Sequence, residues 1–295
     1  MDNLLIALLA LSPNTGKVAK RMVDATCYGI KRFLEPYFIA HEEKVKAKTE
    51  LEIIRNNQLR QLEFAQEFLK NANERFPEEA VRDFSNIVKI IKTAVECTES
   101  HQVEESIYTE EEDREWYARF FDEARYISDE QLQEVWGRLI AERVIHPEGV
   151  NNRVLYFIRS LDKREIECIK RSMRIFLNDD FIPDYVIGRF DGMSHDVSTL
   201  LSLRLIYSSD IMHPLVSAFD LSKETIIKGK GFDFRMTALG NEKEVSVQCY
   251  ALTPEGKVLS RLCKSQLSSK EAQMICDHLN ACWKDKVRVE IVENQ

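Results

Sequence analysis

The sequence predicts a mainly α-helical protein, with a long N-terminal helical hairpin, a central helical bundle and a small C-terminal α+β domain. Three observations support this fold class. The 295 residues include only 10 Gly and 7 Pro, so residues that interrupt helices are scarce. Apolar residues recur three or four positions apart through much of the first two thirds of the chain, which indicates amphipathic helices. Runs rich in β-branched and aromatic residues are confined to the last third.

We divide the chain into five segments. Amphipathic helices occupy residues 1–36, and a long charged helical hairpin follows at 37–97. A linker covers 98–108, the central bundle covers 109–182, and the α+β domain covers 183–295. A chain of this length can bury a sizeable core and is long enough for two or three domains.

The first segment combines an apolar helical face with a basic one. A helix of this kind could rest on a membrane surface and attract anionic lipid, or it could be an ordinary helix that caps the neighbouring domain. It would not span a bilayer, because the apolar run Leu4–Leu11 is far shorter than the roughly 20 residues required. The basic residues are Lys17, Lys20, Arg21, Lys31 and Arg32.

The second segment predicts self-association. From Tyr37 to Phe76 the sequence has no Gly or Pro, and its apolar residues form a heptad-like seam. Pro77 then begins a second helix, so the two should form an antiparallel hairpin. Further apolar residues lie off the seam, and one partner helix cannot cover both sets. We therefore expect packing into a bundle or a homo-oligomer through Leu51, Ile54, Leu62 and Leu69.

The central bundle begins with helix start signals. Thr109 with Glu112, Ser128 with Gln131, and Asp162 with Glu165 each match a capping box. Four helices with short connections follow. Trp116 and Trp136 lie on the apolar faces of two of these helices. Their spacing favours a place in the core over a place in an interface.

The last third predicts a winged-helix-like arrangement. A helix starting at His195-Asp196 precedes β-rich runs, another helix starts at Thr253-Pro254, and a last helix begins at Ser269. The order of helix, β-hairpin and helix resembles the end of winged-helix domains, which bind either DNA or proteins. The expected strands are Thr225–Ile227, Phe232–Met236, Val245–Tyr250 and Val287–Val292.

Nucleic-acid contact, if it occurs, should involve the basic residues around this hairpin: Lys223, Lys228, Lys230 and Arg235. Two observations weigh against it. The helix that would enter the groove, Asp196 to Ile206, offers one arginine, Arg204, and recognition helices carry several polar residues that read bases. The net charge is −8, so an overall basic footprint is excluded.

The sequence predicts no catalytic, cofactor-binding or metal-binding residues. Four consecutive carboxylates, Glu110 to Asp113, point in different directions on a helix and do not converge on one ion. Cys276, His278 and Cys282 form a Cys/His group, but the two cysteines lie about 120° apart on a helix. We also expect no Cys/His pair arranged for nucleophilic catalysis. The odd number of cysteines and the lack of a signal peptide indicate a reducing cytoplasm.

The central block resembles a bacterial family known only as domain of unknown function 2806. The closing motif Leu252 to Lys257 is similar to that of this family, and the N-terminal arrangement also resembles an abortive-infection family. The chain departs from the family pattern at Arg143, where we expect Ala-Gly-Glu rather than Ala-Glu-Arg. The matching residues are Trp116, Phe120, Phe121, Arg125, Ile127 to Glu130, Trp136, Leu139 to Ala141, Pro147, Gly149, Leu161 and Asp162.

The resemblance implies no activity, but it implies a bacterial cytoplasmic protein connected with defence against phage. The sequence therefore favours a non-enzymatic interaction protein that self-associates through its N-terminal helices, with a protein partner or peripheral contact at the inner membrane surface. A winged-helix nucleic-acid regulator is the alternative. A hydrolase whose site is assembled from distant residues is a further one.

Overall fold

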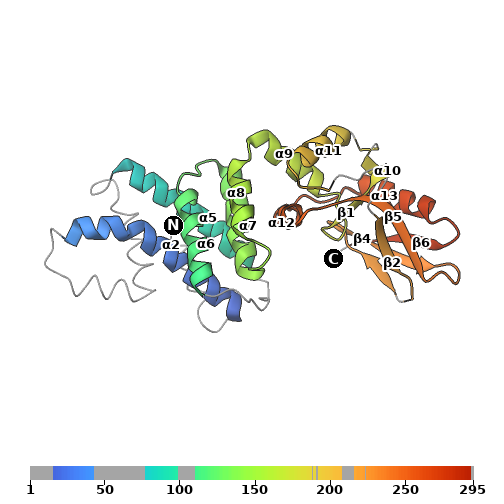
Figure 1. Ribbon diagram of the computed structural model, residues 1–295, viewed down its shortest axis with the longest axis horizontal. Coiled ribbons are helices and arrows are strands. Elements are labelled where there is room, and N and C mark those ends of the chain that lie inside the picture. Colours follow the sequence, from blue (N-terminus) through green and yellow to red (C-terminus); the bar gives the residue numbers. More distant parts are fainter. Residues whose placement is uncertain are drawn as a thin grey trace. The chain divides into compact units, whose positions relative to one another are not determined.

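The computed structural model describes residues 16–42, 77–98, 110–187, 189–190, 192–207, 216–222 and 224–293. The chain forms two compact units, residues 1–159 and 160–295, and is mainly helical with a sheet region in the second unit, as predicted (Figure 1). The heptad-like seam, residues 99–108 of the predicted linker and the cap residue Thr109 lie outside the described residues, whereas residue 98 is the last residue of a helix.

Unit 1 is helical throughout its described part. Helix α2 is one continuous helix that runs past the segment boundary predicted at residue 36, and it packs on α5, α6 and α7. Val18, Met22, Ala25 and Ile30 of α2 are buried. The helices are α2 (Gly16–Glu42), α5 (Glu78–Thr98), α6 (Glu110–Ala124), α7 (Glu130–Ile145) and α8 (Asn152–Ser160).

The core of unit 1 is aromatic. Trp116, Phe120 and Trp136 are almost completely buried, and Phe120 lies 5.2 Å from each tryptophan ring, centroid to centroid. The predicted core position of both tryptophans is confirmed. Helices α5 and α7 approach closely at Gly137, where an added Cβ would lie 2.5 Å from the Cβ of Thr93. Glycine is therefore required at this crossing.

The turn between α6 and α7 is held by buried amides. The Asn86 amide nitrogen donates to the carbonyl of Arg125, and the Gln133 amide nitrogen donates to the carbonyl of Ile127 and to the Asn86 side chain. The cap of α7 is Asp129, which accepts hydrogen bonds from two backbone amides. The predicted cap at Ser128 is wrong by one residue, because a carboxylate at the next position serves the same donors.

Unit 2 contains two antiparallel three-stranded sheets, ordered β1-β5-β2 and β3-β4-β6. The strands predicted from sequence correspond to β3 to β6, whereas β1 and β2 were not predicted. Strands β4 and β5 follow each other along the chain but lie in different sheets. The strands are β1 (Phe181–Pro183), β2 (Val216–Asp220), β3 (Thr225–Ile227), β4 (Phe232–Ala238), β5 (Glu244–Ala251) and β6 (Val287–Glu293).

The helices of unit 2 begin close to the predicted positions. The capping box of Asp162 with Glu165 is present, and Thr253 and Ser268 cap α12 and α13. Helix α13 packs on β6, and the indole of Trp283 donates to the carbonyl of Ser246 in β5, so this region contacts both sheets. The helices are α9 (Lys163–Met173), α10 (Asp184–Ile187), α11 (Met193–Ser202), α12 (Pro254–Leu262) and α13 (Ser269–Cys282).

Across the described segments, every helix is too short or too polar to cross a lipid bilayer.

Candidate functional site

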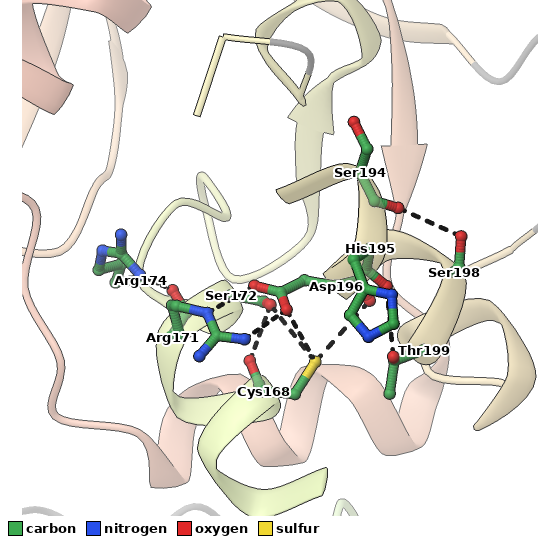
Figure 2. Close-up of polar contacts among 9 residues, drawn as sticks. All are labelled: Cys168, Arg171, Ser172, Arg174, Ser194, His195, Asp196, Ser198 and Thr199. Carbon is green, nitrogen blue, oxygen red and sulfur yellow. Dashed lines mark hydrogen bonds and ion pairs between the residues drawn. The ribbon is translucent and has the colours of Figure 1, made fainter. Parts of the chain in front are cut away.

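A buried ion pair joins α9 to α11 in unit 2 (Figure 2). The guanidinium of Arg171 reaches from α9 and donates to both carboxylate oxygens of Asp196, with Nε 2.7 Å from Oδ2. Asp196 is 1% exposed, whereas the Arg171 side chain is 48% exposed. Burial alone would raise the pKa of the Asp196 carboxyl, but the hydrogen bonds and charge of Arg171 outweigh burial and hold that pKa below its usual value.

The thiol of Cys168 completes this cluster. Its Sγ atom lies 3.5 Å from Oδ1 of Asp196, and Figure 2 shows it facing the carboxylate from α9. Burial, followed by the charge of Asp196, raises the pKa of the Cys168 thiol. A protonated thiol is a hydrogen-bond donor and a poor nucleophile. The arrangement therefore fastens two helices together and does not activate sulfur.

The hydroxyl groups on α11 are used locally. Ser198 donates to the carbonyl of Ser194, and Thr199 donates to the carbonyl of His195, both at 3.2 Å (Figure 2). Hydroxyls that bond back to the preceding turn contribute to helix geometry. We therefore interpret the Cys168–Arg171–Asp196 cluster as structural.

A second polar feature lies on the surface of unit 1. Arg119 on α6 donates to the hydroxyl of Tyr156 on α8 at 3.0 Å, and Arg159 on α8 pairs with Glu123 on α6 at 2.9 Å. Tyr156 is 48% exposed. One ion pair and one hydrogen bond to a phenol thus join the two helices.

A second exposed tyrosine follows the end of α6. Tyr126 is 58% exposed, and the guanidinium carbon of Arg125 lies 4.5 Å from the centre of its ring. The backbone amide of Tyr126 donates to the carbonyl of Glu123 in the last turn of α6. The tyrosine–arginine surface, as we call it, consists of Arg119, Arg125, Tyr126, Tyr156 and Arg159. It was not predicted from the sequence, where Trp116 and Trp136 were the aromatic residues weighed for an interface.

Part of the chain is similar to a known family. Residues 70–180 match the family described as a protein of unknown function (DUF2806). The resemblance of the central block is thereby confirmed over that range, which holds the entire tyrosine–arginine surface. No curated protein and no solved structure gives a significant match to the chain.

Arg143 stands at the expected departure from the DUF2806 pattern, and it is 2% exposed. Its Nη1 donates to the carbonyls of Pro147 and Val150, at 2.9 Å to the latter, and its Nη2 lies 2.7 Å from Oδ1 of Asp113. The guanidinium carbon lies 5.4 Å from the centre of the Trp116 ring. Arg143 thus links α6, α7 and the turn after α7.

The predicted Cys/His group divides in two. Cys276 Sγ donates to the carbonyl of Val289 at 3.3 Å, whereas Cys282 Sγ lies 3.2 Å from Nε2 of His278. The two cysteines do not converge, as predicted. The contact between Cys282 and His278 was not predicted, although residues four apart on a helix share a face. Burial raises the pKa of the Cys282 thiol and lowers the pKa of His278, so the pair is neutral and unsuited to nucleophilic attack.

In the described part of the chain, no group of three or more His, Cys, Asp or Glu side chains is placed to hold a metal ion.

The predicted nucleic-acid contacts have partners within unit 2. Lys228 pairs with Asp233 at 2.5 Å, and Arg235 pairs with Glu224 at 3.1 Å. Lys230 donates to the carbonyls of Ser260 and Cys263 at the end of α12, and lies 3.5 Å from a carboxylate oxygen of Asp179. Lys223 lies outside the described residues. The structure thus assigns Lys230 to a helix terminus and leaves nucleic-acid contact as a prediction.

Replacing Lys230 by Met should lower the free energy of unfolding by about 2 kcal/mol, because the carbonyls at the end of α12 lose a charged donor. Replacing the exposed Arg235 by Met should change it by less than about 1 kcal/mol. Urea denaturation of both variants measures the difference. Equal losses would contradict the assigned role of Lys230.

The predicted N-terminal basic residues are partly used in packing. Arg32 donates to both carboxylate oxygens of Asp122, at 2.7 and 3.1 Å, and so joins α2 to α6. Arg21 and Lys31 are half-buried, while the side chains of Lys17 and Lys20 lie outside the described part. The buried apolar face of α2 favours the packed-helix interpretation over the membrane one, because the face that would insert into lipid is already covered.

Proposed function

We propose that this chain is a non-enzymatic interaction protein that self-associates, with the tyrosine–arginine surface as its binding face. The observation that carries the proposal is the exposure of Tyr126 and Tyr156, at 58% and 48%, each in contact with an arginine side chain. Tyrosine and arginine are over-represented among the residues that dominate binding energy in protein interfaces.

The geometry of this surface suits binding because its side chains are already held. Arg119 fixes the phenol of Tyr156, and Arg125 lies over the ring of Tyr126. A side chain held in one conformation loses less entropy on association.

The alternation of charge supports a second copy as the partner. Along α6, Glu115 and Glu123 flank Arg119, and Arg119 also pairs with Glu115. A surface that carries both signs can pair with a rotated copy of itself, as a two-fold interface requires. The N-terminal seam at Leu51, Ile54, Leu62 and Leu69 is the other candidate interface.

The cellular context we propose is abortive-infection-type defence against phage in a bacterial cytoplasm, which rests on the resemblances of the N-terminal and central segments. A protein partner belongs to the same proposal, whereas peripheral membrane contact is less favoured because the apolar face of α2 is buried. Binding of nucleic acid is less favoured, because Lys228, Lys230 and Arg235 already have acidic or carbonyl partners in unit 2.

Sedimentation velocity tests self-association. The full chain should sediment as a dimer or larger species at concentrations up to about 50 μM, in the range of weak and transient interfaces. The double variant Tyr126→Ala/Tyr156→Ala should sediment as a monomer. Tyr207→Ala is the matched control, because Tyr207 is equally exposed in unit 2, and it should behave like the parent.

A second variant pair separates the two interfaces. Leu62→Asp/Leu69→Asp should leave the assembly intact if the tyrosine–arginine surface is the binding face. Dissociation of this variant alone would assign the interface to the N-terminal helices and contradict the role of the tyrosines. A parent chain that remains monomeric throughout the range would contradict self-association itself.

A further inference from the structure

Strand β2 lies at the edge of its sheet in unit 2. It pairs with β5 on one side, and in the described part of the chain its other side has no paired strand. The backbone amide of Leu221 donates to the carbonyl of Lys243 at 2.8 Å. Because bonded and non-bonded pairs alternate along an antiparallel ladder, the backbone groups of Val216, Ala218 and Asp220 point away from β5.

The contacts around the ladder agree with this direction. Ser246 of β5 lies opposite Ala218, and its carbonyl accepts from the indole of Trp283 at 2.8 Å instead of from β2. The outward carbonyl of Asp220 accepts from the hydroxyl of Thr225. Within the described residues, the outward amides and carbonyls of Val216 and Ala218 have no hydrogen-bond partner. They remain available for a further strand.

Other strand edges in unit 2 are protected. In β6, the amide of Val289 donates to the side chain of Asn280 at 2.8 Å, and its carbonyl accepts from the same amide group at 2.9 Å. Strand β1 ends at Pro183, which has no amide hydrogen to donate. The sequence of β2, Val-Ser-Ala-Phe-Asp, contains neither Lys nor Pro, and Val216 is 52% exposed. An edge without such protection pairs readily with another chain.

The outer face of this edge is negatively charged at one end. Asp220 lies directly opposite Glu244, and both are exposed on the same face as Val216 and Ala218. Like charges at directly opposite positions are destabilising, so a cation beside Asp220 is favoured. The exposed residues of β5 farther along this face, Ser246 and Gln248, are uncharged.

We propose that β2 binds an extended segment of a protein partner as an added antiparallel strand, with a Lys or Arg beside Asp220 and apolar residues beside Ala218 and Val216. Backbone hydrogen bonds would supply affinity, and the alternate side chains would supply selectivity. The inference rests on the proposed function only in that the chain has a protein partner. It does not depend on the tyrosine–arginine surface.

An NMR titration of the full chain with the capped peptide Thr-Arg-Thr-Val-Thr-Val-Thr tests this surface. In the antiparallel register its arginine lies beside Asp220 and its valines lie beside Ala218 and Val216. The amide signals of Val216 and Ala218 should shift most, with a dissociation constant of about 1 mM or tighter. The same peptide with Glu in place of Arg should bind at least about fivefold more weakly, because it adds a third carboxylate.

Two N-methylated peptides provide a matched control. A methyl group on the nitrogen of the central valine removes a donor that faces β2, and this peptide should not shift the two amides. A methyl group on the nitrogen of the threonine that follows it lies on the opposite edge of the peptide, so binding should be largely retained.

Variants of the chain test the charge. Asp220→Asn/Glu244→Gln should remove the preference for the arginine peptide, whereas Glu290→Gln, at an exposed position in the other sheet, should keep it. Tyr126→Ala/Tyr156→Ala should bind the peptide as the parent does, so a failure of self-association would leave this inference intact.

Three results would overturn the inference. They are unchanged amide signals of Val216 and Ala218 at about 5 mM peptide, equal binding of the two N-methylated peptides, and equal binding of the arginine and glutamate peptides. Shifts of the same signals on dilution without peptide would assign the edge to a second copy of the chain, which also contradicts it.

Discussion

Replacing Arg143 by Met should lower the free energy of unfolding of unit 1 by about 3–5 kcal/mol. Arg143 is 2% exposed, and its guanidinium bonds two backbone carbonyls and Asp113. Removing one partner of a buried pair leaves the remaining charge and carbonyls without a hydrogen-bond donor, and this is strongly destabilising. Methionine keeps much of the side-chain volume, so the loss reports the polar contacts rather than a cavity.

Chemical denaturation followed by tryptophan fluorescence measures this effect, because Trp116 lies under the Arg143 guanidinium. Arg119→Met is the control. Arg119 is 39% exposed in its pair with Glu115, and exposed pairs of this kind contribute about 0–1 kcal/mol. A loss below about 1 kcal/mol for Arg143→Met would show that the buried contacts do not stabilise the bundle.

Replacing Arg171 by Met should destabilise unit 2 by about 2–3 kcal/mol at neutral pH. The carboxylate of Asp196 is 1% exposed and would lose its counterion. The expected loss is smaller than for Arg143 because the Arg171 side chain is half-exposed and solvent screens part of the interaction. The exposed Arg164 on the same helix provides the control Arg164→Met, which should change stability by less than about 1 kcal/mol.

The stability that the Arg171–Asp196 ion pair contributes should decrease at low pH. The pKa of folded Asp196 lies below its ordinary value of 3.8, so its ionised form stabilises the folded state. The stability difference between the parent and Asp196→Asn should therefore be constant above about pH 5. It should shrink as the pH falls below about 4 and through the folded pKa. A difference that grows on acidification would contradict this assignment.

Arg171→Met should behave differently from Asp196→Asn. Without the guanidinium, burial becomes the main influence on Asp196 and raises its pKa in the folded state. The penalty for burying the charge then disappears on protonation. The destabilisation of Arg171→Met relative to the parent should thus decrease between pH 7 and about pH 4.

Local sequence signals predicted much of the fold. The capping box at Asp162, the Thr253-Pro254 helix start and four of the strands could be read directly, because each depends on residues close in sequence. Strand β2 was not predicted, and its partner β5 lies more than twenty residues away. Strands β4 and β5 belong to different sheets. This arrangement depends on contacts between distant parts of the chain, so the residues near each strand do not predict it.

The candidate sites were harder to predict. Trp116 and Trp136 were placed correctly because their helical spacing matches that of other apolar residues. The tyrosine–arginine surface depends on a contact between Arg119 and Tyr156, which are 37 positions apart. The pair of His278 and Cys282 could have been found from its spacing of four. A spacing of four places two side chains on the same face of a helix, whereas the spacing of six between Cys276 and Cys282 does not.

The position of β6 has a consequence for synthesis on the ribosome. Strand β4 pairs on one side with β3 and on the other with β6, residues 287–293. The second sheet therefore cannot close until those residues have left the exit tunnel, whereas the described helices of unit 1 are complete by residue 160. Nascent unit 1 can acquire its core first, and the unpaired side of β4 remains open to chaperones until translation reaches β6.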